Sequence, residues 1–432
     1  MKKVREGYKI TEFGEIPQEW DVISFFNFIE KIIDFRGRTP KKLGMDWGNG
    51  NIVALSANNV KMGKIDFNLE SYYASEELYK KWMSGNELSK GDILMTMEAP
   101  LGNIAIVPDN NKYILSQRVV AFKTKDFINN TFMKYMLMSD IVQSQLEVLS
   151  TGTTAKGINQ KNLAKAFVII PTLKEQEKIA SILSTVDEQI DNVDALIEKN
   201  KELKKGLIQT LLTKGIGHTK FKKTEIGEIP EEWEIKELSE LYSENIRDFG
   251  SFSTTKLIEY VEEGIPYLRA ENFRENKIVL NSVSYITEEV DKLLDKSYVY
   301  DGNILFTKIG NIGCATVYRG ELGTRCNSNA TIAKIKIDEN IYDSNYIVYF
   351  LNSLQCKKQY IGSIISTPPR INMGEISKFK IAIPKLYEQT KIASILLKVD
   401  SKIEEYENKK IMFEELKKGL MQQLLTGKTR IC

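Results

Sequence analysis

The sequence EQEKIASIL at residues 175–183 returns as EQTKIASIL at residues 388–396, an offset of 213 residues. Two other pairs of segments repeat at this offset: TEFGEIPQEW (11–20) with TEIGEIPEEW (224–233), and ELKKGL (202–207) with ELKKGL (415–420). A fixed offset shared by three near-identical pairs identifies an internal repeat, which must be read before any local feature. The chain is therefore a tandem duplication of a unit of about 213 residues.

The two copies agree only in outline between these segments. Residues 52–60 read IVALSANNV, whereas their counterparts at 265–273 read IPYLRAENF. The apolar pattern is kept while the polar residues and loop lengths differ. Neutral drift after duplication and two scaffolds that present different recognition surfaces explain this equally well at this point.

Each copy begins with a region whose pattern is typical of a mixed α/β domain. Short β-branched or aromatic runs bounded by Gly, Asn, Asp or Pro predict strands, here at residues 52–57, 92–97, 104–107 and 114–123. The Met- and Leu-rich stretch at residues 130–149 has helical spacing and predicts a helix on that sheet.

Each copy ends with a long helix that carries a narrow apolar seam. Ile179, Val186 and Val193 step by seven residues in the first copy, as Ile392 and Val399 do in the second. Mixed charges fill the other faces, so the pattern favours a coiled coil; the alternative is a helix buried lengthwise on a globular core. Asn200 lies on the seam, where a buried Asn would fix register.

Composition excludes several classes of protein. The chain has 432 residues, a formal charge of +2 and 42% apolar residues, and no apolar run approaches the ~20 residues that span a bilayer. Its N-terminus is polar and basic, which predicts a cytoplasmic protein rather than a secreted one. The four cysteines form no C-x-x-C pair, and His218 is the only histidine. His218 lies in a Gly- and Lys-rich connector, where we expect it to be exposed.

Catalytic motifs are incomplete wherever they are suggested. The GKT at residues 427–429 resembles the end of a P-loop, but the required upstream glycine would fall at Gln422. The TPPR at residues 367–370 lacks both the amide and the aromatic residue of the N-P-P-[YF] loop of amino-methyltransferases. The sequence therefore indicates a binding protein, and we expect no metal or cofactor in this chain.

The duplicated E-I-P-x-E-W openings, the EQ-x-KIASIL helices and the ELKKGL endings together resemble the specificity (S) subunits of type I restriction–modification systems over essentially the whole chain. That resemblance implies a non-catalytic subunit that binds double-stranded DNA and reads a bipartite, asymmetric target, one half-site per target-recognition domain. It also implies two methyltransferase (M) subunits that carry S-adenosylmethionine, translocase–nuclease (R) subunits, and no membrane partner.

The resemblance implies an α+β fold: a tandem duplication of a mixed α/β target-recognition domain followed by a long helix, with the two helices pairing as an antiparallel coiled coil. The predicted boundaries are a first recognition domain at 1–173, a central spacer helix at 174–215, a second recognition domain at 216–386, a C-terminal spacer helix at 387–426 and a tail at 427–432.

Base readout requires Arg, Lys, Asn or Gln in the major groove, and phosphate contacts use Lys, Arg, Ser and Thr. Polar loops of the first copy supply these candidates: Arg36, Arg38, Thr39, Lys41, Lys42, Ser56, Asn58, Asn59, Gln117, Arg118, Thr153, Thr154 and Lys156. Corresponding places in the second copy supply Arg247, Ser251, Arg269, Asn272, Arg274, Arg325, Asn327, Asn329, Thr367 and Arg370. Matching places thus carry different hydrogen-bonding groups, which favours diversified readout over drift.

Two other functions stay open from the sequence. A coiled-coil adaptor whose β domains bind peptides would show no sequence-selective DNA binding. An enzyme that uses scattered carboxylates and a bound metal ranks last, because no cluster of residues indicates where its site would be. A polar residue in a surface turn is also more often solvated, or capping the turn, than in contact with a base.

Overall fold

The computed structural model describes residues 4–152, 155–244, 246–247, 258–274, 277–364 and 369–431. The chain divides into two compact units: unit 1 comprises residues 1–194 and 408–432, and unit 2 comprises residues 195–407. Both long helices run from one unit into the other. Each unit is described by itself, in the order in which its elements occur along the chain.

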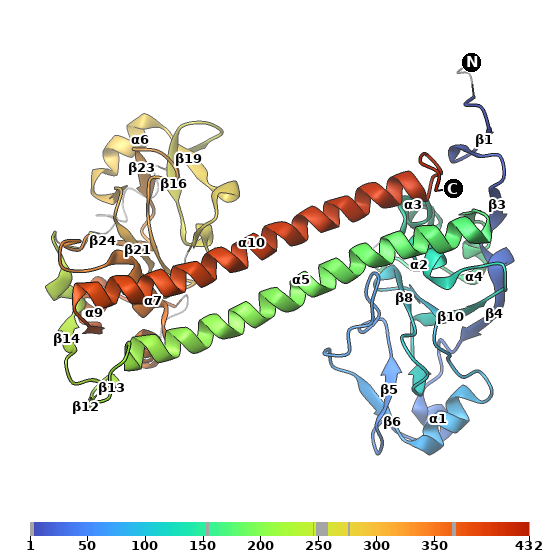
Figure 1. Ribbon diagram of the computed structural model, residues 1–432, viewed down its shortest axis with the longest axis horizontal. Helices are drawn as coiled ribbons and strands as arrows, with labels where there is room; N and C mark the ends of the chain where they lie inside the picture. Colours follow the sequence, from blue (N-terminus) through green and yellow to red (C-terminus); the bar gives the residue numbers. More distant parts are fainter. Residues whose placement is uncertain are drawn as a thin grey trace. The chain divides into compact units, whose positions relative to one another are not determined.

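Most of unit 1 consists of short strands and helices that precede the first long helix (Figure 1). Its strands are β1 (Tyr8–Thr11), β2 (Gly14–Pro17), β3 (Asp21–Ser24), β4 (Ile29–Asp34), β5 (Ile52–Leu55), β6 (Tyr72–Ala74), β7 (Ile93–Met97), β8 (Leu101–Ile106), β9 (Tyr113–Leu115), β10 (Val119–Thr124) and β11 (Phe167–Ile170). Its helices are α1 (Glu76–Met83), α2 (Asn130–Met138), α3 (Asp140–Leu149), α4 (Gln160–Leu163), the start of α5 (Leu173–Lys214) and the end of α10 (Leu386–Leu424).

A four-stranded sheet in the order β4-β10-β7-β8 forms the centre of unit 1. Side chains alternate across a strand, so Ile93, Met95 and Met97 of β7 enter the core beneath α2 and α3, while Leu94 enters a second core. The second core is shared with α1 and with the mixed β6-β5-β9 sheet, in which β5 and β9 are parallel. Both faces of the central sheet are therefore covered, as its continuously buried β7 requires.

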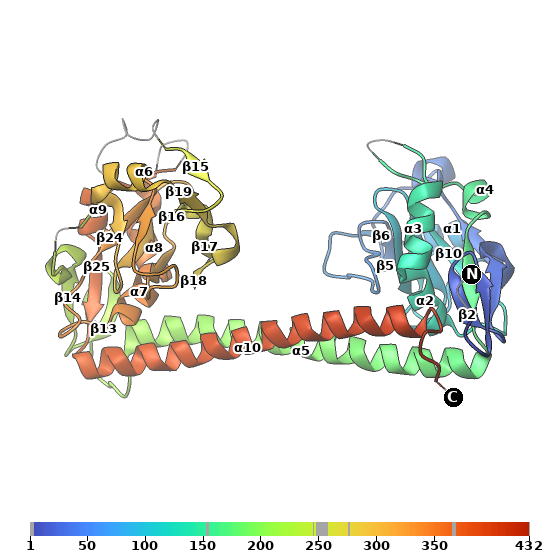
Figure 2. The same ribbon diagram turned by 90° about the horizontal axis from the view of Figure 1, so that it is seen from above.

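Unit 2 repeats this framework with shorter strands (Figure 2). Its strands are β12 (Phe221–Thr224), β13 (Gly227–Pro230), β14 (Glu234–Glu237), β15 (Tyr260–Val261), β16 (Ile265–Leu268), β17 (Phe273–Arg274), β18 (Lys277–Ile278), β19 (Ser284–Ile286), β20 (Tyr298–Val299), β21 (Ile304–Thr307), β22 (Ala315–Val317), β23 (Cys326–Ser328), β24 (Ile332–Ile335) and β25 (Lys380–Ile383). Its helices are the end of α5, α6 (Glu288–Leu293), α7 (Ser344–Asn352), α8 (Leu354–Tyr360), α9 (Met373–Ser377) and the start of α10 (Leu386–Leu424).

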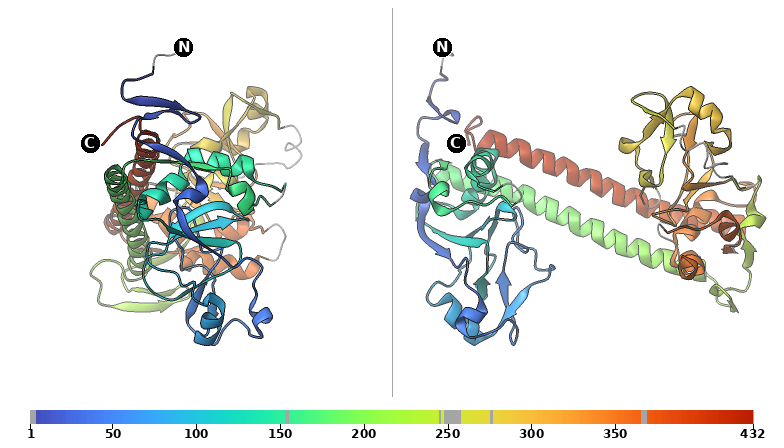
Figure 3. Two further views of the ribbon diagram at one scale, coloured as in Figure 1. Left: turned by 90° about the vertical axis from the view of Figure 1, so that its right-hand side faces the viewer. Right: turned by 180° about the vertical axis from the view of Figure 1, so that it is seen from behind.

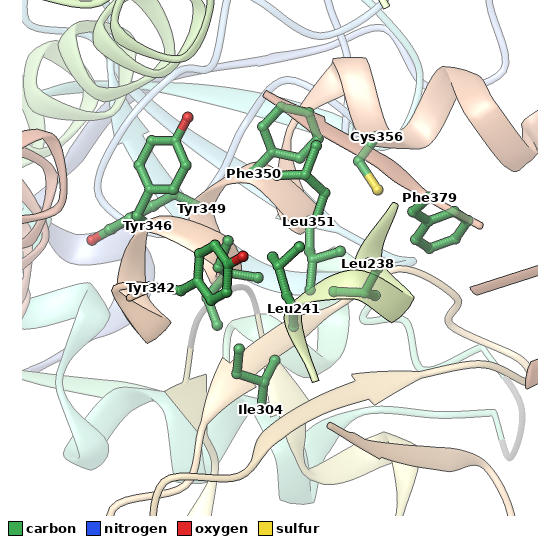
Figure 4. Close-up of a cluster of buried hydrophobic side chains, with 14 of the residues drawn as sticks. Leu238, Leu241, Ile304, Tyr342, Tyr346, Tyr349, Phe350, Leu351, Cys356 and Phe379 are labelled. Carbon is green, nitrogen blue, oxygen red and sulfur yellow. The ribbon is translucent and has the colours of Figure 1, made fainter. Parts of the chain in front are cut away.

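The core of unit 2 keeps the same alternation across its sheets. The β22-β21-β24 sheet takes the place of the central sheet, and the parallel pair β16–β23 takes the place of β5–β9. Ile304 and Phe306 pack with the aromatic side chains of α7, whereas Leu305 between them faces another cluster. Figure 4 shows Tyr346, Tyr349 and Phe350 of α7 within the first of these clusters.

The long helices α5 and α10 run antiparallel within each unit. In unit 1, Asp187 pairs with Lys417 at 2.6 Å and Asp194 pairs with Lys410 at 2.7 Å, so one number rises as the other falls. In unit 2, Lys204 pairs with Asp400 at 2.6 Å. The predicted helix ranges, 174–215 and 387–426, differ from the observed ones by one or two residues at each end.

The apolar seam is buried near the start of each long helix, whereas Val399, further along α10, is only partly buried. Ile179, Leu183 and Val193 of α5 and Ile392 and Leu396 of α10 are all buried. The predicted register role of Asn200 does not fit its contacts. Asn200 is only half-buried, and its side-chain amide donates to the carbonyl of Leu196 in its own helix at 2.7 Å.

Two local predictions are corrected by the structure. The predicted helix at residues 130–149 is broken at Ser139, whose extended backbone (ψ 155°) ends α2 before α3 begins. The predicted strand at residues 114–123 is two strands, separated by the turn at residues 116–118. In the part of the chain that the structure describes, no helix has both the length and the apolar character needed to cross a bilayer.

Candidate nucleic-acid interface

A buried Trp–Glu contact anchors each recognition domain to its long helix. Trp20 Nε1 donates to Glu175 Oε2 at 3.0 Å, and Trp233 Nε1 donates to Glu388 Oε2 at 3.2 Å. Trp20 and Trp233 are each 1% exposed. Both tryptophans therefore pack as buried scaffold residues.

The side chain that contacts this glutamate differs between the copies. Arg430 of the C-terminal tail binds Glu175 at 2.9 Å in unit 1, where the tail lies beside the β1–β2 hairpin (Figure 3). His218 Nε2 lies 2.9 Å from Glu388 Oε1 in unit 2. His218 is therefore not the exposed histidine that its Gly- and Lys-rich surroundings predicted, because its side chain is only 15% exposed.

Six predicted DNA contacts of the first copy line one recess of about 570 Å³ in unit 1. They are Thr39, Lys41, Ser56, Asn58, Gln117 and Arg118. The loops that carry them follow β4, β5 and β9, three strands that are separate in the sequence. The sheet topology thus brings together polar side chains that the sequence only placed in similar turns.

The recess also takes residues that the sequence did not nominate. Asp46, Trp47, Lys61 and Tyr72 lie along its wall, and Ala99-Pro100 forms part of its rim. Trp47 stacks on Tyr72 with ring centroids 5.5 Å apart and an interplanar angle of 16°. The loop at residues 44–50 contains no run of cations or amides, so its sequence did not mark it as a DNA contact. Only the tertiary structure places this loop beside the others.

Arg36 and Arg38 lie in the most basic of the predicted loops. Both side chains contact residues of their own domain. The Arg36 guanidinium contacts the Asp34 carboxylate, with 2.6 Å from Nη2 to Oδ2. Burial would raise the pKa of Asp34, but hydrogen bonds from Arg36 outweigh burial and lower that pKa. Arg38 lies over the Phe35 ring at 4.4 Å and donates to the carbonyl of Trp82. Both arginines therefore stabilise the loop that leads into the recess.

Three predicted asparagine contacts are buried structural residues. Asn59, Asn272 and Asn327 are each 0% exposed. Asn59 and Asn272 stand at matching positions, and each accepts from the backbone N–H three residues earlier, at 3.3 Å from Ser56 and 2.8 Å from Arg269. A buried amide with its partners satisfied cannot reach a base without unfolding the turn, so a direct contact does not fit these three positions.

The remaining candidates are two lysines of the first copy and six residues of the second. Lys42 donates to the Gly37 carbonyl at 2.7 Å, and Lys156 pairs with Glu147 at 2.6 Å, but both stay exposed. In unit 2, Arg325 pairs with the buried Asp291 at 2.6 Å, and Arg247 lies over the Tyr300 ring at 4.8 Å. Also in unit 2, Arg269 pairs with Glu271, and the Asn329 side chain accepts a hydrogen bond from the Thr331 backbone N–H. Arg274 lines a cavity of about 1250 Å³ within unit 2. Arg370 is exposed and forms an isolated β-bridge with Ile309.

Four predicted residues lie outside the described part of the chain: Thr153, Thr154, Ser251 and Thr367. The structure also bears on metal binding. Among the residues that it describes, no group of three or more His, Cys, Asp or Glu side chains is arranged to hold a metal ion. In unit 1 the recess is polar and partly aromatic, and it lies at the ends of strands from two sheets.

A duplicated α+β framework with polar loops gathered at one site defines a class of modular recognition proteins. The family model described as "Type I restriction modification DNA specificity domain" matches this chain twice, at residues 17–204 and 230–412. The chain belongs to the type I restriction–modification DNA specificity family.

Relatives and solved structures agree with this assignment. The chain is 28% identical to the type I restriction enzyme MjaVIII specificity subunit of Methanocaldococcus jannaschii, covering 100% of this chain and 99% of the relative. It is 29% identical to the putative MjaX specificity subunit of that organism, covering 99% and 97%. The crystal structure of the type I S subunit from M. genitalium matches in fold with a TM-score of 0.57 at 16% identity, covering 98% of this chain and 97% of that one. Two tandem recognition domains suit a target read in two halves.

Proposed function

We propose that this chain is the non-catalytic specificity subunit of a type I restriction–modification assembly, and that each domain reads one half-site of an asymmetric DNA target. One observation carries the proposal. The same framework occurs twice with shared residues at its buried positions, such as Asn59 and Asn272, and with different polar residues in the exposed loops around it. A protein that reads two different half-sites needs this division between constant framework and varied surface.

The charge of the unit 1 recess suits a DNA contact. Lys41, Lys61 and Arg118 line it together with the amides of Asn58 and Gln117. Cations at phosphates release condensed counterions and give salt-dependent affinity. Arg and amide side chains can bond base edges in the major groove and supply the sequence preference.

The proposal leaves the chemistry to partners. Two methyltransferase subunits would bind S-adenosylmethionine and dock on this chain, and translocase–nuclease subunits would join for cleavage. We expect the assembly to act in the cytoplasm, where it meets chromosomal DNA. The charged outer faces of α5 and α10 supply an extended surface for such subunits.

The test uses the full chain purified with the methyltransferase subunits of its own restriction–modification system. Sequences bound from a randomised duplex pool are determined at 50 and 200 mM salt. We expect enrichment of one bipartite sequence, with affinity falling steeply as salt rises. A second protein, in which another family member's recognition domain replaces residues 24–170, should change one half of that sequence and keep the other.

Two results would contradict the proposal. Absence of any enriched sequence in the wild-type complex would favour the coiled-coil adaptor instead. A change of both halves after the domain replacement would show that the domains do not read independently.

A further inference from the structure

The loop at residues 44–50 is fixed against unit 1 by backbone and ring contacts. Gly48 N–H donates to the Tyr73 carbonyl at 2.7 Å. An added Cβ at Gly50 would lie 2.2 Å from the Ala74 carbonyl oxygen, so the two backbones touch. The Trp47 ring packs against Trp82, 5.4 Å away, which is itself fully buried. The side chain that precedes Trp47 is therefore presented from a rigid support.

That side chain is Asp46, an exposed carboxylate on the wall of the recess. It makes no hydrogen bond or ion pair with any residue in the described part of the chain. An unpaired carboxylate beside Lys41, Lys61 and Arg118 weakens attraction to phosphates, because like charges repel. Asp46 thus lowers general affinity for DNA and must act in some other way if the recess reads DNA.

We infer that Asp46 is a specificity-determining residue of the first half-site, which accepts a hydrogen bond from the exocyclic amino group of a cytosine. The inference rests on the proposed function. A carboxylate accepts hydrogen bonds but cannot donate them. In the major groove cytosine presents only a donor, N4–H₂, whereas adenine presents an N7 acceptor beside its N6–H₂ donor, guanine presents O6 and N7 acceptors, and thymine presents O4. Asp46 therefore favours cytosine and repels guanine and thymine at the position it faces.

This role predicts that general affinity for DNA and discrimination between bases change in opposite directions when Asp46 is replaced. Asp46→Asn removes the negative charge and adds a donor while keeping the shape of the side chain. Affinity for unrelated duplex DNA should rise, because one repulsion of phosphates is lost. Discrimination at one base pair of the first half-site should fall about tenfold, because the added amide can bond guanine or adenine as well.

The experiment compares four full-length proteins, each purified with its methyltransferase subunits: wild type, Asp46→Asn, Asp46→Ala and Asp126→Asn. Asp126 is an exposed carboxylate of the same unit that does not line the recess, so it controls for the loss of one charge. Bound sequences from a randomised duplex pool give the preference at each position, and a fixed unrelated duplex gives general affinity.

Both Asp46 variants should relax one position of the first half-site, keep the second half-site unchanged and bind the unrelated duplex more tightly. Asp126→Asn should keep the wild-type preferences. The inference is overturned if both half-sites are read unchanged by the Asp46 variants, or if these variants lose specific and general affinity together, as a purely structural role predicts. A wild-type complex that selects no sequence would instead overturn the proposed function, so the two failures are distinguishable.

Discussion

Arg118 carries a backbone cost that its intramolecular contacts do not explain. Its φ is 65°, in the left-handed region that costs a non-glycine residue about 1 kcal/mol. Its ion pair with Glu98 spans 3.3 Å, but both side chains are about half exposed (52% and 51%). Exposed pairs of this kind add little to stability. The position favours glycine for folding, so an arginine here indicates a role at the recess.

Arg118→Gly should therefore weaken DNA binding without weakening the fold. Relief of the left-handed strain should raise the free energy of unfolding by about 0.5 kcal/mol, as urea denaturation would measure. Loss of the guanidinium should reduce affinity for the selected target about tenfold. The control is Arg118→Ala, which loses the same contact but keeps the strain and should gain no stability. Unchanged target affinity in both variants would exclude Arg118 as a contact.

At this scale the sequence identified where the polar loops are but not what each residue does. A turn-forming Asn and a base-reading Asn are the same residue type, so Asn58 and Asn59 could not be separated by composition. The internal repeat contains the missing signal: Asn59 recurs as Asn272, both buried, whereas Asn58 is replaced by Glu271 and is exposed. At these two adjacent positions, the residue shared by the copies belongs to the framework and the residue that differs lies on the surface.

At the scale of elements, one partly buried cluster joins each domain to both long helices. In unit 1, Tyr135 Oη of α2 donates to Asp187 Oδ2 of α5 at 2.6 Å, and Lys417 of α10 binds Asp187 Oδ1 at 2.6 Å. In unit 2, Asp400 accepts from Tyr349 at 2.6 Å and pairs with Lys204. Burial would raise the pKa of Asp187, but hydrogen bonds from Lys417 and Tyr135 outweigh it and lower that pKa.

Asp187→Asn should lower the free energy of unfolding at pH 7 by about 2 kcal/mol, because hydrogen bonds to a charged group are lost. The pKa of Asp187 is lower in the folded than in the unfolded state, so its stabilisation is complete above the unfolded value of about 3.9. It is lost as the pH falls through the folded value. The difference between wild type and variant should thus be constant at neutral pH and shrink below about pH 4.

Urea titrations between pH 3 and pH 7 measure this difference. Glu188→Gln is the matched control, because Glu188 is the next residue of the same helix and is exposed. It should give a curve parallel to that of the wild type. A wild-type advantage over Asp187→Asn that grows below pH 4 would contradict the assignment of the ion pair.

The sequence predicted the helices that have a strong apolar periodicity, but it did not predict where a helix or strand is interrupted. The heptad seam gave both long helices, because a 3.5-residue apolar repeat is a property of sequence alone. The break at Ser139 was missed, since Met- and Leu-rich spacing continues across it. The short range 116–118 was read as strand because its neighbours are apolar, although its residues form the turn that presents Gln117 and Arg118.

At the scale of the whole molecule, the resemblance to type I specificity subunits implies that the helix pair sets the gap between half-sites. Matched insertion of four residues, between 194 and 201 in α5 and between 407 and 410 in α10, keeps every helix–helix ion pair named above. Each insertion adds about 6 Å of helix. One base pair of DNA rises about 3.4 Å, so the gap should lengthen by one or two base pairs while each half-site stays the same.

Sequencing of the duplexes selected by the double-insertion protein measures the gap. Insertion in α5 alone is the control. It displaces Lys204 from Asp400 and should lower stability rather than produce a new defined gap. An unchanged gap in a stable double-insertion protein would contradict the spacer role.

The Trp–Glu contact has a consequence for how this protein can evolve. Trp20, Glu175, Trp233 and Glu388 all lie in the segments that the two copies share. Genetic recombination between those repeated coding segments would deliver a new domain already fitted with the anchor that attaches it to its helix. A lineage can then acquire a different DNA target sequence in one recombination event, without a series of compensating substitutions in the core. The duplication thus makes a change of target possible at little cost in folding.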